Sequence, residues 1–315
     1  MLRKTFKLNH SIHYECIRNC FVPASQNIFE SDVQYLQDFI DQSTRLTVIT
    51  GAGISTESGI PDYRSKDVGL YSKNGYRPMN YSEFLNEHSL RQRYWARSFL
   101  GWNYMRNREP NISHITLAEW QKRRKIFSCV TQNVDRLHQK AGMKSVIELH
   151  GNLYTVKCIT CNQRQSREHF QKVLTDLNKD ILEEDWIKTV LLGQSYHKTL
   201  RPDGDIDVEN DFLNSFQIPY CERCTGILKP DIVFFGDNVP LELVNKIYET
   251  VEKSDSILVI GSSLQVYSSY RFVLQAHLSG KRIAIINIGP TRGDGLKGVL
   301  KIESKISDII TKIST

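Results

Sequence analysis

The sequence lacks any apolar run of the length that a membrane span requires. Its longest apolar stretches, such as 257–261 and 283–286, are the size of strands and fall short of the roughly 18 residues needed. Internal repeats and low-complexity tracts are also missing. With 40% hydrophobic and 24% charged residues, the composition is that of neither a disordered chain nor a collagen. We therefore expect a folded protein without a membrane span, long enough at 315 residues to form two lobes.

A strong charge of either sign is missing too. The net charge is +6, and an excess of three positive charges lies in the first 29 residues, which carry Arg3, Lys4, Lys7 and Arg18 against Glu15. The rest of the chain is close to balanced, so nucleic acid is not expected as a partner. The segment 1–29 has the character either of a mitochondrial transit segment or of a disordered basic tail, and its residues alone leave both open.

The seven cysteines do not indicate a disulfide framework, because their number is odd and no secretory signal precedes them. Four of them form two Cys-x-x-Cys pairs, Cys158 with Cys161 and Cys221 with Cys224. Two such pairs supply the four thiolates of a closed, tetrahedral structural zinc site. Redox-active pairs are the alternative interpretation. Cys129 lies in an apolar run and is expected to be a small core residue.

Apolar segments typical of buried strands recur along the chain, at 46–50, 126–130, 146–149, 232–235, 257–260 and 283–288. Helical patterns lie between several of them, at 81–105, 114–124, 240–253 and 268–279. Ser31 is expected to cap a helix before the first strand. This alternation predicts an α/β fold, a Rossmann-like doubly wound parallel sheet with helices on both faces.

One stretch interrupts the alternation. Residues 152–229 contain both cysteine pairs and a long polar insertion at 162–220, with helical patterns near 168–178 and 181–192. We expect this stretch to be a small zinc-ribbon domain inserted into the Rossmann-like domain, which takes residues 30–151 and 230–315. Part of 190–210 is expected to fold over the entrance of the active site.

A glycine-rich loop, Gly51-Ala52-Gly53, follows the first expected strand. Glycines at such a turn let a phosphate group approach the backbone closely. The dinucleotide fingerprint is incomplete, because Thr56 stands where its third glycine belongs, and this disfavours a hydride-transferring dehydrogenase. The loop also lacks the Gly-Lys-Ser/Thr of a P-loop, which excludes that class of nucleotide triphosphatase.

Polar segments follow other expected strands and should converge with this loop at one edge of the sheet. They are Thr131–Asp135, Glu148–Gly151, Gly261–Ser263 and Asn287–Gly289. Each segment has an alternative local role, such as capping a turn or a helix. Four of them at a single edge favour a ligand site.

In order and spacing, these segments resemble the motif series of the sirtuin family, from about residue 30 to the C-terminus. The resemblance is carried by Gly51–Arg64, Thr131–His138, His150-Gly151, the two cysteine pairs and Gly261–Ser263. Segments 61–71, 91–97 and 287–291 are most similar to the class II branch, which has a mitochondrial member. The resemblance therefore favours a mitochondrial transit segment at 1–29 and a location in the mitochondrial matrix.

The resemblance implies NAD as co-substrate, bound in a cleft between the two lobes, and one structural zinc held by the four paired cysteines. It assigns the cofactor loop to Ala52, Asp62, Tyr63, Arg64 and Tyr71. It assigns the nicotinamide pocket to Ile60, Asn133 and Asp135, the ribose contact to Gln132, the phosphate and ribose side to Ser262 and Ser263, and the adenosine end to Asn287 and Ile306. Neighbours within the same motifs complete the implied NAD site, namely Gly51, Gly53, Val134, Gly261, Ile288 and Gly289.

The implied activity is NAD-dependent deacylation of lysine side chains in mitochondrial proteins, with release of nicotinamide and transfer of the acyl group to ADP-ribose. His150 is implied as the catalytic base, a task that suits an imidazole with an ordinary pKa of about 6.5. Mono-ADP-ribosylation of proteins at the same NAD site is the first alternative. A non-catalytic binding module built on the zinc lobe is the second, and retention of Asn133, Asp135 and His150 together argues against it. The oligomeric state is left open.

Tyr94 and Arg97 lie three residues apart on an expected helix and so share one face. They match the Tyr-x-x-Arg with which class II relatives bind acidic acyl groups. A guanidinium binds a carboxylate in a bidentate fashion, which favours methylglutaryl or hydroxymethylglutaryl groups. The alternative is that both residues pack the helix and pair with glutamates. Removal of lipoyl or biotinyl groups would instead require an apolar tunnel.

Overall fold

The computed structural model describes residues 21–25, 27–72, 78–191, 201–206 and 210–315. The chain divides into two compact units, which we call the sheet unit and the cysteine unit. The sheet unit comprises residues 1–74, 108–149 and 240–315, and the cysteine unit comprises residues 75–107 and 150–239. Most of the expected transit segment, residues 1–20, lies outside the described residues.

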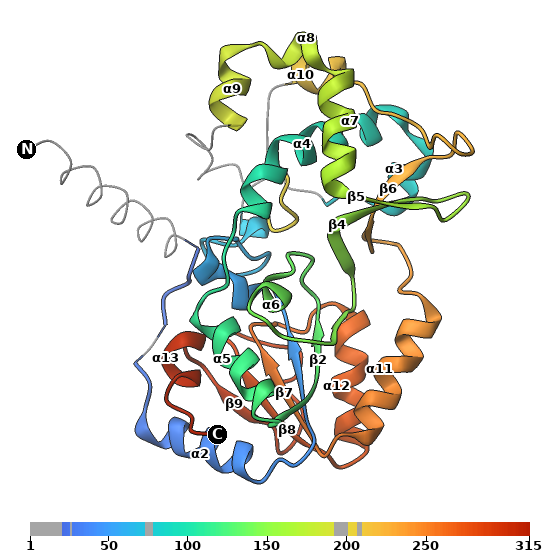
Figure 1. The fold of residues 1–315 in the computed structure, drawn as a ribbon. Helices are drawn as coiled ribbons and strands as arrows, with labels where there is room; N and C mark the ends of the chain where they lie inside the picture. The colour runs from blue at the N-terminus through green and yellow to red at the C-terminus, as the bar shows by residue number, and fades with distance from the viewer. Residues whose placement is uncertain (1–20, 26, 73–77, 192–200, 207–209) are drawn as a thin grey trace, which may run out of the picture. The chain divides into compact units, whose positions relative to one another are not determined.

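The sheet unit is built on a six-stranded parallel sheet (Figure 1). Its strands are β1 (Leu46–Thr50), β2 (Ile126–Thr131), β3 (Val146–Glu148), β7 (Ser256–Ile260), β8 (Arg282–Ile286) and β9 (Leu300–Ile302). In space they follow the order β3-β2-β1-β7-β8-β9, and every neighbouring pair is parallel. This is the strand order of the Rossmann fold, so the predicted fold class is confirmed.

Helices cover both faces of this sheet. On one face, α2 (Glu30–Asp41), α5 (Ile112–Lys122) and α13 (Ile306–Ile310) contribute to a single hydrophobic core with alternate residues of β1 and β7. On the other, α11 (Leu241–Lys253) and α12 (Tyr267–Leu278) lie side by side (Figure 1). β1 and β7 are buried along their whole length, which explains why their sequences are mostly apolar and do not alternate with exposed polar residues.

Three local expectations were wrong. The run 232–235 is not a strand of the parallel sheet, and only Ile232 of it belongs to a named strand, β6 (Leu228–Ile232), which pairs with β4 (Gly151–Cys158) in the cysteine unit. Hydrophobicity marks a buried strand but does not say which sheet it joins. The sixth parallel strand, β9, is only three residues long and was missed. Ser31 does not cap α2, because that helix already begins at Glu30, after Phe29.

The cysteine unit has a small antiparallel sheet in the order β5-β4-β6, where β5 is Arg164–Ser166. Its helices are α3 (Tyr81–Asn86), α4 (His88–Arg106), α7 (Arg167–Leu177), α8 (Lys179–Leu182), α9 (Asp185–Leu191) and α10 (Asn210–Ser215). The helix expected at 81–105 is therefore two helices, separated by Glu87 in extended conformation.

The helix α4 groups with this unit, although the sequence assigned residues 75–107 to the Rossmann-like domain. The reason is packing. The ring of Trp95 on α4 lies 4.6 Å from that of Phe170 on α7. The buried guanidinium of Arg167 donates to the Ser98 carbonyl at 3.2 Å and lies over the rings of Trp95 and Trp102. The polar insertion thus has a core of its own, built on α4.

Residues 201–206 also pack on α4. A Cβ atom at Gly101, in the middle of the helix, would lie 1.6 Å from the carbonyl oxygen of Gly204, so only glycine permits this approach. Much of the segment 190–210 lies outside the described residues. Its expected position over the entrance of the active site stays a prediction.

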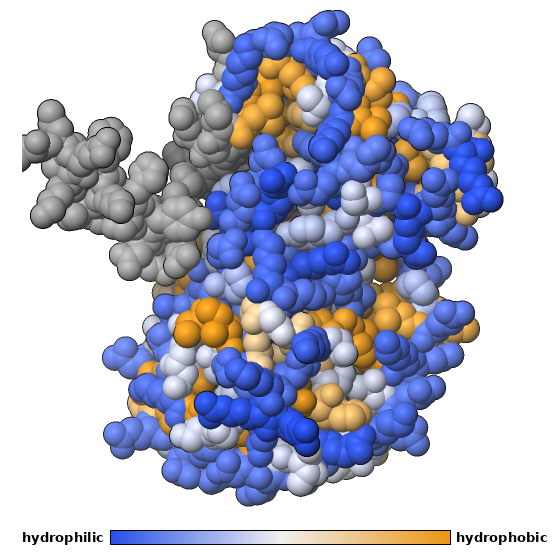
Figure 2. Space-filling model, in the orientation of Figure 1, coloured by the Kyte–Doolittle hydropathy of each residue, from blue (hydrophilic) through white to orange (hydrophobic). Residues whose placement is uncertain are grey.

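The face of the molecule that Figure 2 shows is mostly hydrophilic, and its hydrophobic residues form separate patches. Among the described residues, no helix is both long enough and apolar enough to cross a membrane.

Candidate functional site

The first part of the candidate site lies where the strand order of the sheet unit reverses, between β1 and β7. Ligands of doubly wound folds bind at the carboxyl ends of the strands at such a point. The chain leaves β1 through Gly51 and Gly53, whose amides donate to the carbonyls of Ile260 and Gly261 at 3.1 and 2.9 Å. Added Cβ atoms at these two glycines would lie 2.7–2.9 Å from Gly261 and Ser262. Glycine is needed here for close packing of two strand ends.

A short 3₁₀ helix, η1 (Ala52–Ser58), follows the glycines and carries Ser55 toward the polar segment after β2. The Ser55 hydroxyl donates to Asp135 Oδ2 at 2.7 Å and accepts from Asn133 Nδ2 at 3.0 Å. The expected pair Asn133 and Asp135 is therefore held together by a third residue. The sequence analysis did not include Ser55, although its position in the glycine motif was a signal.

Asp135 is almost completely buried, with 5% of its surface exposed. Burial raises the pKa of its carboxyl group, while hydrogen bonds from the Leu137 amide and the Ser55 hydroxyl oppose that shift without cancelling it. Each carboxylate oxygen accepts one of these two bonds, at 2.9 and 2.7 Å, and retains capacity for a further donor. The site thus presents acceptors that can hold an N–H group of a ligand.

The substitution Asp135→Asn is expected to change how stability depends on pH. A carboxyl group whose pKa is raised on folding costs stability as the pH increases from its unfolded value of about 3.9 through its folded value. The variant should lack this decline and should gain stability relative to the parent at neutral pH, while losing activity. Urea unfolding at pH 4 and pH 7 measures the difference. An equal loss of stability at both pH values would contradict the expectation.

The polar segments after β2 and β7 also meet. Gln132 Nε2 donates to Ser262 Oγ at 2.8 Å and to the Thr50 carbonyl at 3.2 Å. Ser262 Oγ accepts a second bond from the Leu264 amide at 3.2 Å, so its own proton is left for an oxygen acceptor. Ser263 follows with a half-buried side chain. The structure therefore brings Gln132 and Ser262 together, as their strand-end positions predicted.

A buried hydrogen-bond network, which the sequence did not predict, lies next to the polar segment after β2. His138 Nε2 lies 2.8 Å from Thr50 Oγ1, which donates to Thr131 Oγ1 at 2.9 Å. Thr131 Oγ1 in turn accepts from the Asn133 amide at 3.1 Å. Burial lowers the pKa of His138 to about 4, so this imidazole is neutral at physiological pH. A neutral ring that donates through Nε2 fits the network, because the Thr50 proton is already used.

The expected cofactor loop is folded around Asp62. Its carboxylate accepts from the amides of Arg64 and Ser65 at 3.0 and 2.8 Å and from the Ser65 hydroxyl. The rings of Tyr63 and Tyr71 lie 5.7 Å apart, and the Arg64 guanidinium lies 5.0 Å from the Tyr71 ring centroid. Ile60, which precedes the loop, is buried. In this structure Asp62 shapes the loop, and its contact with a cofactor stays a prediction.

The expected adenosine end lies after β8. Asn287 Nδ2 donates to the carbonyls of Ile288 and Gly289 at 2.8 and 3.2 Å, which braces the turn. The Gly289 amide donates to Glu303 Oε1 at 2.9 Å. Ile306 begins α13 and is buried. Val134 is half-buried, between Asn133 and Asp135.

His150 belongs to the cysteine unit, next to β4. Its carbonyl accepts from the Val233 amide at 2.9 Å, and the following Gly151 has a positive φ of 76°. A Cβ at Gly151 would lie 1.9 Å from the Asp231 carbonyl oxygen, so glycine is required beside this histidine. The backbone that carries His150 is thus fixed, and its catalytic role stays a prediction.

Tyr94 and Arg97 both lie on α4, in the same unit. Tyr94 is 2% exposed, and its ring packs edge-on against Phe84 and Phe234 at 5.5 and 5.1 Å. Arg97 is half-buried. Their assignment to an acyl pocket stays a prediction.

The four paired cysteines come together at one end of the small sheet. Their Sγ atoms all lie within 4.8 Å of one another, with Cys158 and Cys224 separated by 3.5 Å and Cys161 and Cys221 by 3.8 Å. A tetrahedral zinc site with Zn–S bonds of about 2.3 Å requires sulfur atoms about 3.8 Å apart, whereas a disulfide requires about 2 Å. The cluster therefore fits a structural zinc. Cys129, as expected, is buried in the core.

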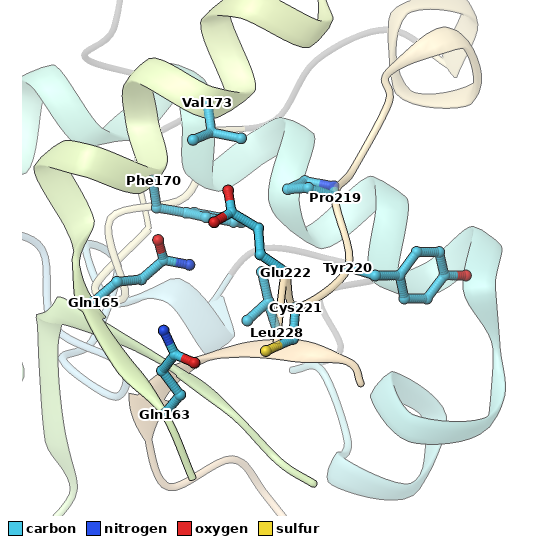
Figure 3. Close-up of a pocket in the computed structure, with 9 residues that line it drawn as sticks. All are labelled: Gln163, Gln165, Phe170, Val173, Pro219, Tyr220, Cys221, Glu222 and Leu228. Atoms are coloured by element: carbon cyan, nitrogen blue, oxygen red, sulfur yellow. The ribbon is translucent and has the colours of Figure 1, made fainter. Parts of the chain in front are cut away.

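A shallow pocket lies beside this cluster (Figure 3). Phe170, Val173 and Leu228 supply its apolar wall, and Gln163, Gln165 and Glu222 supply polar groups. Cys221 is the one member that the sequence analysis had singled out, in its role as a metal ligand. None of the residues implied to bind NAD or to act as the base lines this pocket, so it is not part of the candidate site.

Comparison with known proteins adds independent findings. Residues 51–268 match the model of the Sir2 family. The chain is 43% identical to the Drosophila melanogaster protein named NAD-dependent protein deacylase Sirt4, over 96% of this chain and 93% of that one. It is 45% identical to the Homo sapiens protein named NAD-dependent protein lipoamidase sirtuin-4, mitochondrial, over 93% and 89% of the two chains.

Among solved structures, the chain is similar to one described as Sir2-p53 peptide-NAD+, with a TM-score of 0.65 and 29% identity. The match covers 89% of this chain and 95% of that one. The family model spans well over half of the chain, and the relatives match it along nearly their whole length. The chain belongs to the Sir2 family.

Proposed function

We propose that this protein is an NAD-dependent protein lysine deacylase. The observation that carries the proposal is the arrangement at the reversal of strand order, where Asn133, Asp135 and Gln132 lie beside the glycine loop and Ser262. The printed names of the Drosophila and human relatives, a deacylase and a lipoamidase that depend on NAD, support it. Family membership alone would leave the activity open, because one fold hosts many functions.

The residues at this point fit a dinucleotide that carries a carboxamide. Asp135 offers acceptors to a carboxamide N–H, and Asn133 offers a side-chain oxygen, since its Nδ2 already donates to Ser55. Ser262 has a proton for a ribose or phosphate oxygen. NAD, when bound, supplies the ADP-ribosyl group that accepts the acyl group as nicotinamide leaves. The protein's part is to hold and orient the carboxamide through Asn133 and Asp135.

The second catalytic task is a proton transfer, which we assign to His150. An imidazole with an ordinary pKa near 6.5 can take a proton from a hydroxyl group at working pH. The rigid backbone on both sides of His150 keeps the ring's attachment point fixed. The four-cysteine zinc takes no part in this chemistry, because a site with four thiolates is closed.

We assign the binding site of the acyl group to Tyr94 and Arg97. The half-buried Arg97 can pair with a carboxylate through its planar guanidinium, and the buried Tyr94 lies three residues earlier on the same helix. This supports methylglutaryl or hydroxymethylglutaryl as preferred acyl groups. The name of the human relative supports lipoyl as a further substrate, and biotinyl belongs to the same class of long amide-linked chains.

We expect purified, zinc-loaded protein to turn over acyl-lysine peptides with NAD, yielding nicotinamide and O-acyl-ADP-ribose. A panel of acetyl, succinyl, glutaryl, methylglutaryl, hydroxymethylglutaryl, lipoyl and biotinyl peptides, followed by mass spectrometry, measures the preference. The substitution Arg97→Met should reduce kcat/KM for acidic acyl groups by about tenfold or more, because a charge-assisted pair is lost, and should spare lipoyl peptides.

Arg93→Met is the matched control, since Arg93 also lies on α4 but reaches Asn214 at 3.4 Å. Equal effects of both variants on every peptide would remove the pocket assignment and leave the mechanism. ADP-ribose on protein with no O-acyl-ADP-ribose from any peptide would favour mono-ADP-ribosylation. Absence of both products from folded protein would favour the binding module.

A mitochondrial location is part of the proposal, with the matrix as the expected compartment and acylated mitochondrial proteins as the expected substrates. The basic excess of residues 1–29 and the word mitochondrial in the human relative's name support it. Fractionation of cells that express the full chain would test the location.

A further inference from the structure

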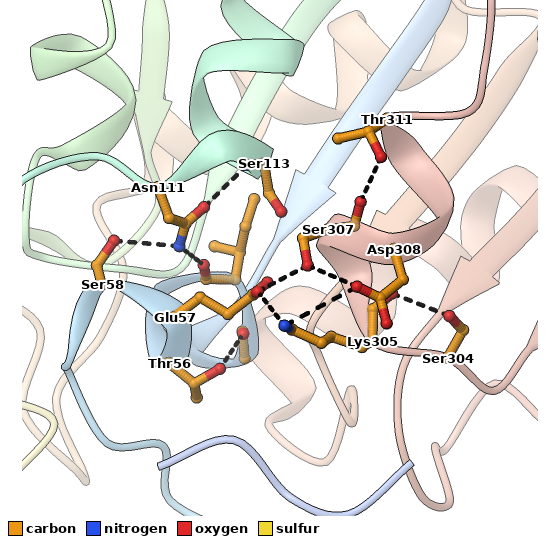
Figure 4. A network of polar contacts seen from close by, with 12 residues as sticks. Thr56, Glu57, Ser58, Asn111, Ser113, Ser304, Lys305, Ser307, Asp308 and Thr311 are labelled. Atoms are coloured by element: carbon orange, nitrogen blue, oxygen red, sulfur yellow. Dashed lines mark hydrogen bonds and ion pairs between the residues drawn. The ribbon is translucent and has the colours of Figure 1, made fainter. Parts of the chain in front are cut away.

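A compact polar cluster joins η1 to the C-terminal part of the sheet unit (Figure 4). Glu57, on η1, pairs with Lys305 Nζ at 3.1 Å, and its Oε1 accepts from the Ser307 hydroxyl at 2.7 Å. We call these three residues the Glu57 cluster. Lys305 and Ser307 stand 248 and 250 positions after Glu57 in the sequence, so only the tertiary fold brings them into contact with it.

The cluster is shielded from solvent. The side chain of Glu57 is 12% exposed and that of Lys305 is 28% exposed. A carboxylate removed from water to this extent depends on its partners, because an unpaired buried charge is strongly unfavourable. Asp308 lies at the outer side, 3.9 Å from Lys305 Nζ, with half of its side chain in solvent. Lys305 is therefore committed mainly to Glu57.

The other side of η1 is held independently. Asn111, at the start of α5, donates through Nδ2 to the Ile54 carbonyl at 2.8 Å and to the Ser58 hydroxyl at 3.1 Å (Figure 4). Within η1, the Thr56 hydroxyl donates to the Gly53 carbonyl at 2.9 Å. Asn111 at the start of α5 holds η1 from one side. Through the Glu57 cluster, η1 in turn holds the segment 305–307 in place.

The position of this tie matters for the proposed NAD site, on which the inference rests. Lys305 and Ser307 flank Ile306, which is assigned to the adenosine end, and Glu57 lies four residues after Gly53, at the phosphate end. We propose that Glu57 is a positioning residue that fixes the distance between the two ends of the dinucleotide site. It touches neither substrate nor cofactor, and it acts through Lys305 and Ser307.

The test is equilibrium binding of ADP-ribose, measured by calorimetry on the full chain. Glu57→Ala should raise the Kd about tenfold, the loss expected when a charge-assisted contact no longer holds the competent conformation. Glu57→Gln keeps an acceptor for Ser307 and should have a smaller effect, matched by Lys305→Met. The double variant Glu57→Gln/Lys305→Met should be no worse than either single one, because both remove the same pair. In steady-state kinetics, KM for NAD should rise while kcat at saturating NAD and KM for the peptide stay unchanged.

Thr311→Val is the control, at the C-terminal end of α13, because the Thr311 hydroxyl donates to the Ser307 carbonyl at 2.7 Å and does not touch Glu57. It should leave the Kd of ADP-ribose unchanged. A lowered melting temperature of Glu57→Ala with an unchanged Kd would show a merely structural role and overturn the inference, while the proposed function would stand. Failure of the parent protein to bind either NAD or ADP-ribose would instead overturn the proposed function, and the inference with it.

Discussion

Replacing Cys221 by serine is expected to unfold the small β5-β4-β6 sheet of the cysteine unit and to abolish stoichiometric zinc. The four sulfur atoms lie close enough together for a tetrahedral site, and they join the end of β4 and the loop after it to the segment before β6. In small zinc domains, metal binding contributes about 10 kcal/mol or more, most of which is folding free energy. The three-stranded sheet is too small to replace that contribution by apolar burial. Metal analysis and hydrogen exchange of β4 and β6 measure the effect.

A strong chelator should act in the same way on the parent protein, and added zinc should reverse it. Cys129→Ala is the matched control. Its thiol is buried in β2, in the core of the sheet unit, and is not one of the four clustered cysteines. That variant should keep one zinc per chain and lose only a small amount of stability. Full protection of β4 and β6 in zinc-free Cys221→Ser would show that the sheet folds without metal.

His150→Tyr is expected to lower turnover at saturating NAD and acyl peptide by about 10²- to 10⁴-fold, the usual contribution of a general base. Tyrosine cannot take the proton, because its ordinary pKa of about 10 keeps its hydroxyl protonated at working pH. The fold should remain, since the contact that fixes this position is made by the His150 backbone carbonyl with the Val233 amide. Initial rates of O-acyl-ADP-ribose formation measure the loss, and calorimetry measures NAD binding.

His169→Gln serves as the matched control, because His169 is an exposed histidine on α7 of the same unit. It should leave both turnover and NAD binding unchanged. If His150→Tyr bound NAD normally and kept more than a tenth of the parent rate, another group would have to be the base.

The pattern of apolar runs and motifs in the sequence predicted much of the fold. The mostly apolar runs at 46–50, 257–260 and 283–288 mark β1, β7 and β8 of one parallel sheet, because strands covered on both faces favour apolar residues on both sides. The prediction of a parallel strand at 232–235 was wrong, because an apolar run also occurs where the chain packs into the core of the cysteine unit. In the apolar run 232–235, Phe234 is buried against Phe84 and Tyr94 in the cysteine unit, and a one-dimensional pattern cannot say in which unit an apolar run is buried.

The candidate site, too, was predicted only in part from the sequence. The sequence located Asn133, Asp135, Gln132 and Ser262 from their positions after expected strands. It missed Ser55, which joins Asn133 to Asp135, and the network of His138, Thr50 and Thr131 beneath them. These residues have no distinctive spacing. Their roles come from hydrogen bonds between strands that are neighbours only in space.

By itself, the sequence determined the Rossmann-like sheet, the four-cysteine cluster and the resemblance to sirtuins, because periodicity, metal-ligand spacing and motif order are local properties of the chain. The tertiary structure alone decided that α4 packs with the cysteine unit, that Ser55 links the two side chains proposed to hold nicotinamide, and that Glu57 meets Lys305 and Ser307. These are contacts between segments far apart in sequence. They form because burial of the apolar cores also buries polar groups, and buried polar groups must form hydrogen bonds or ion pairs with one another.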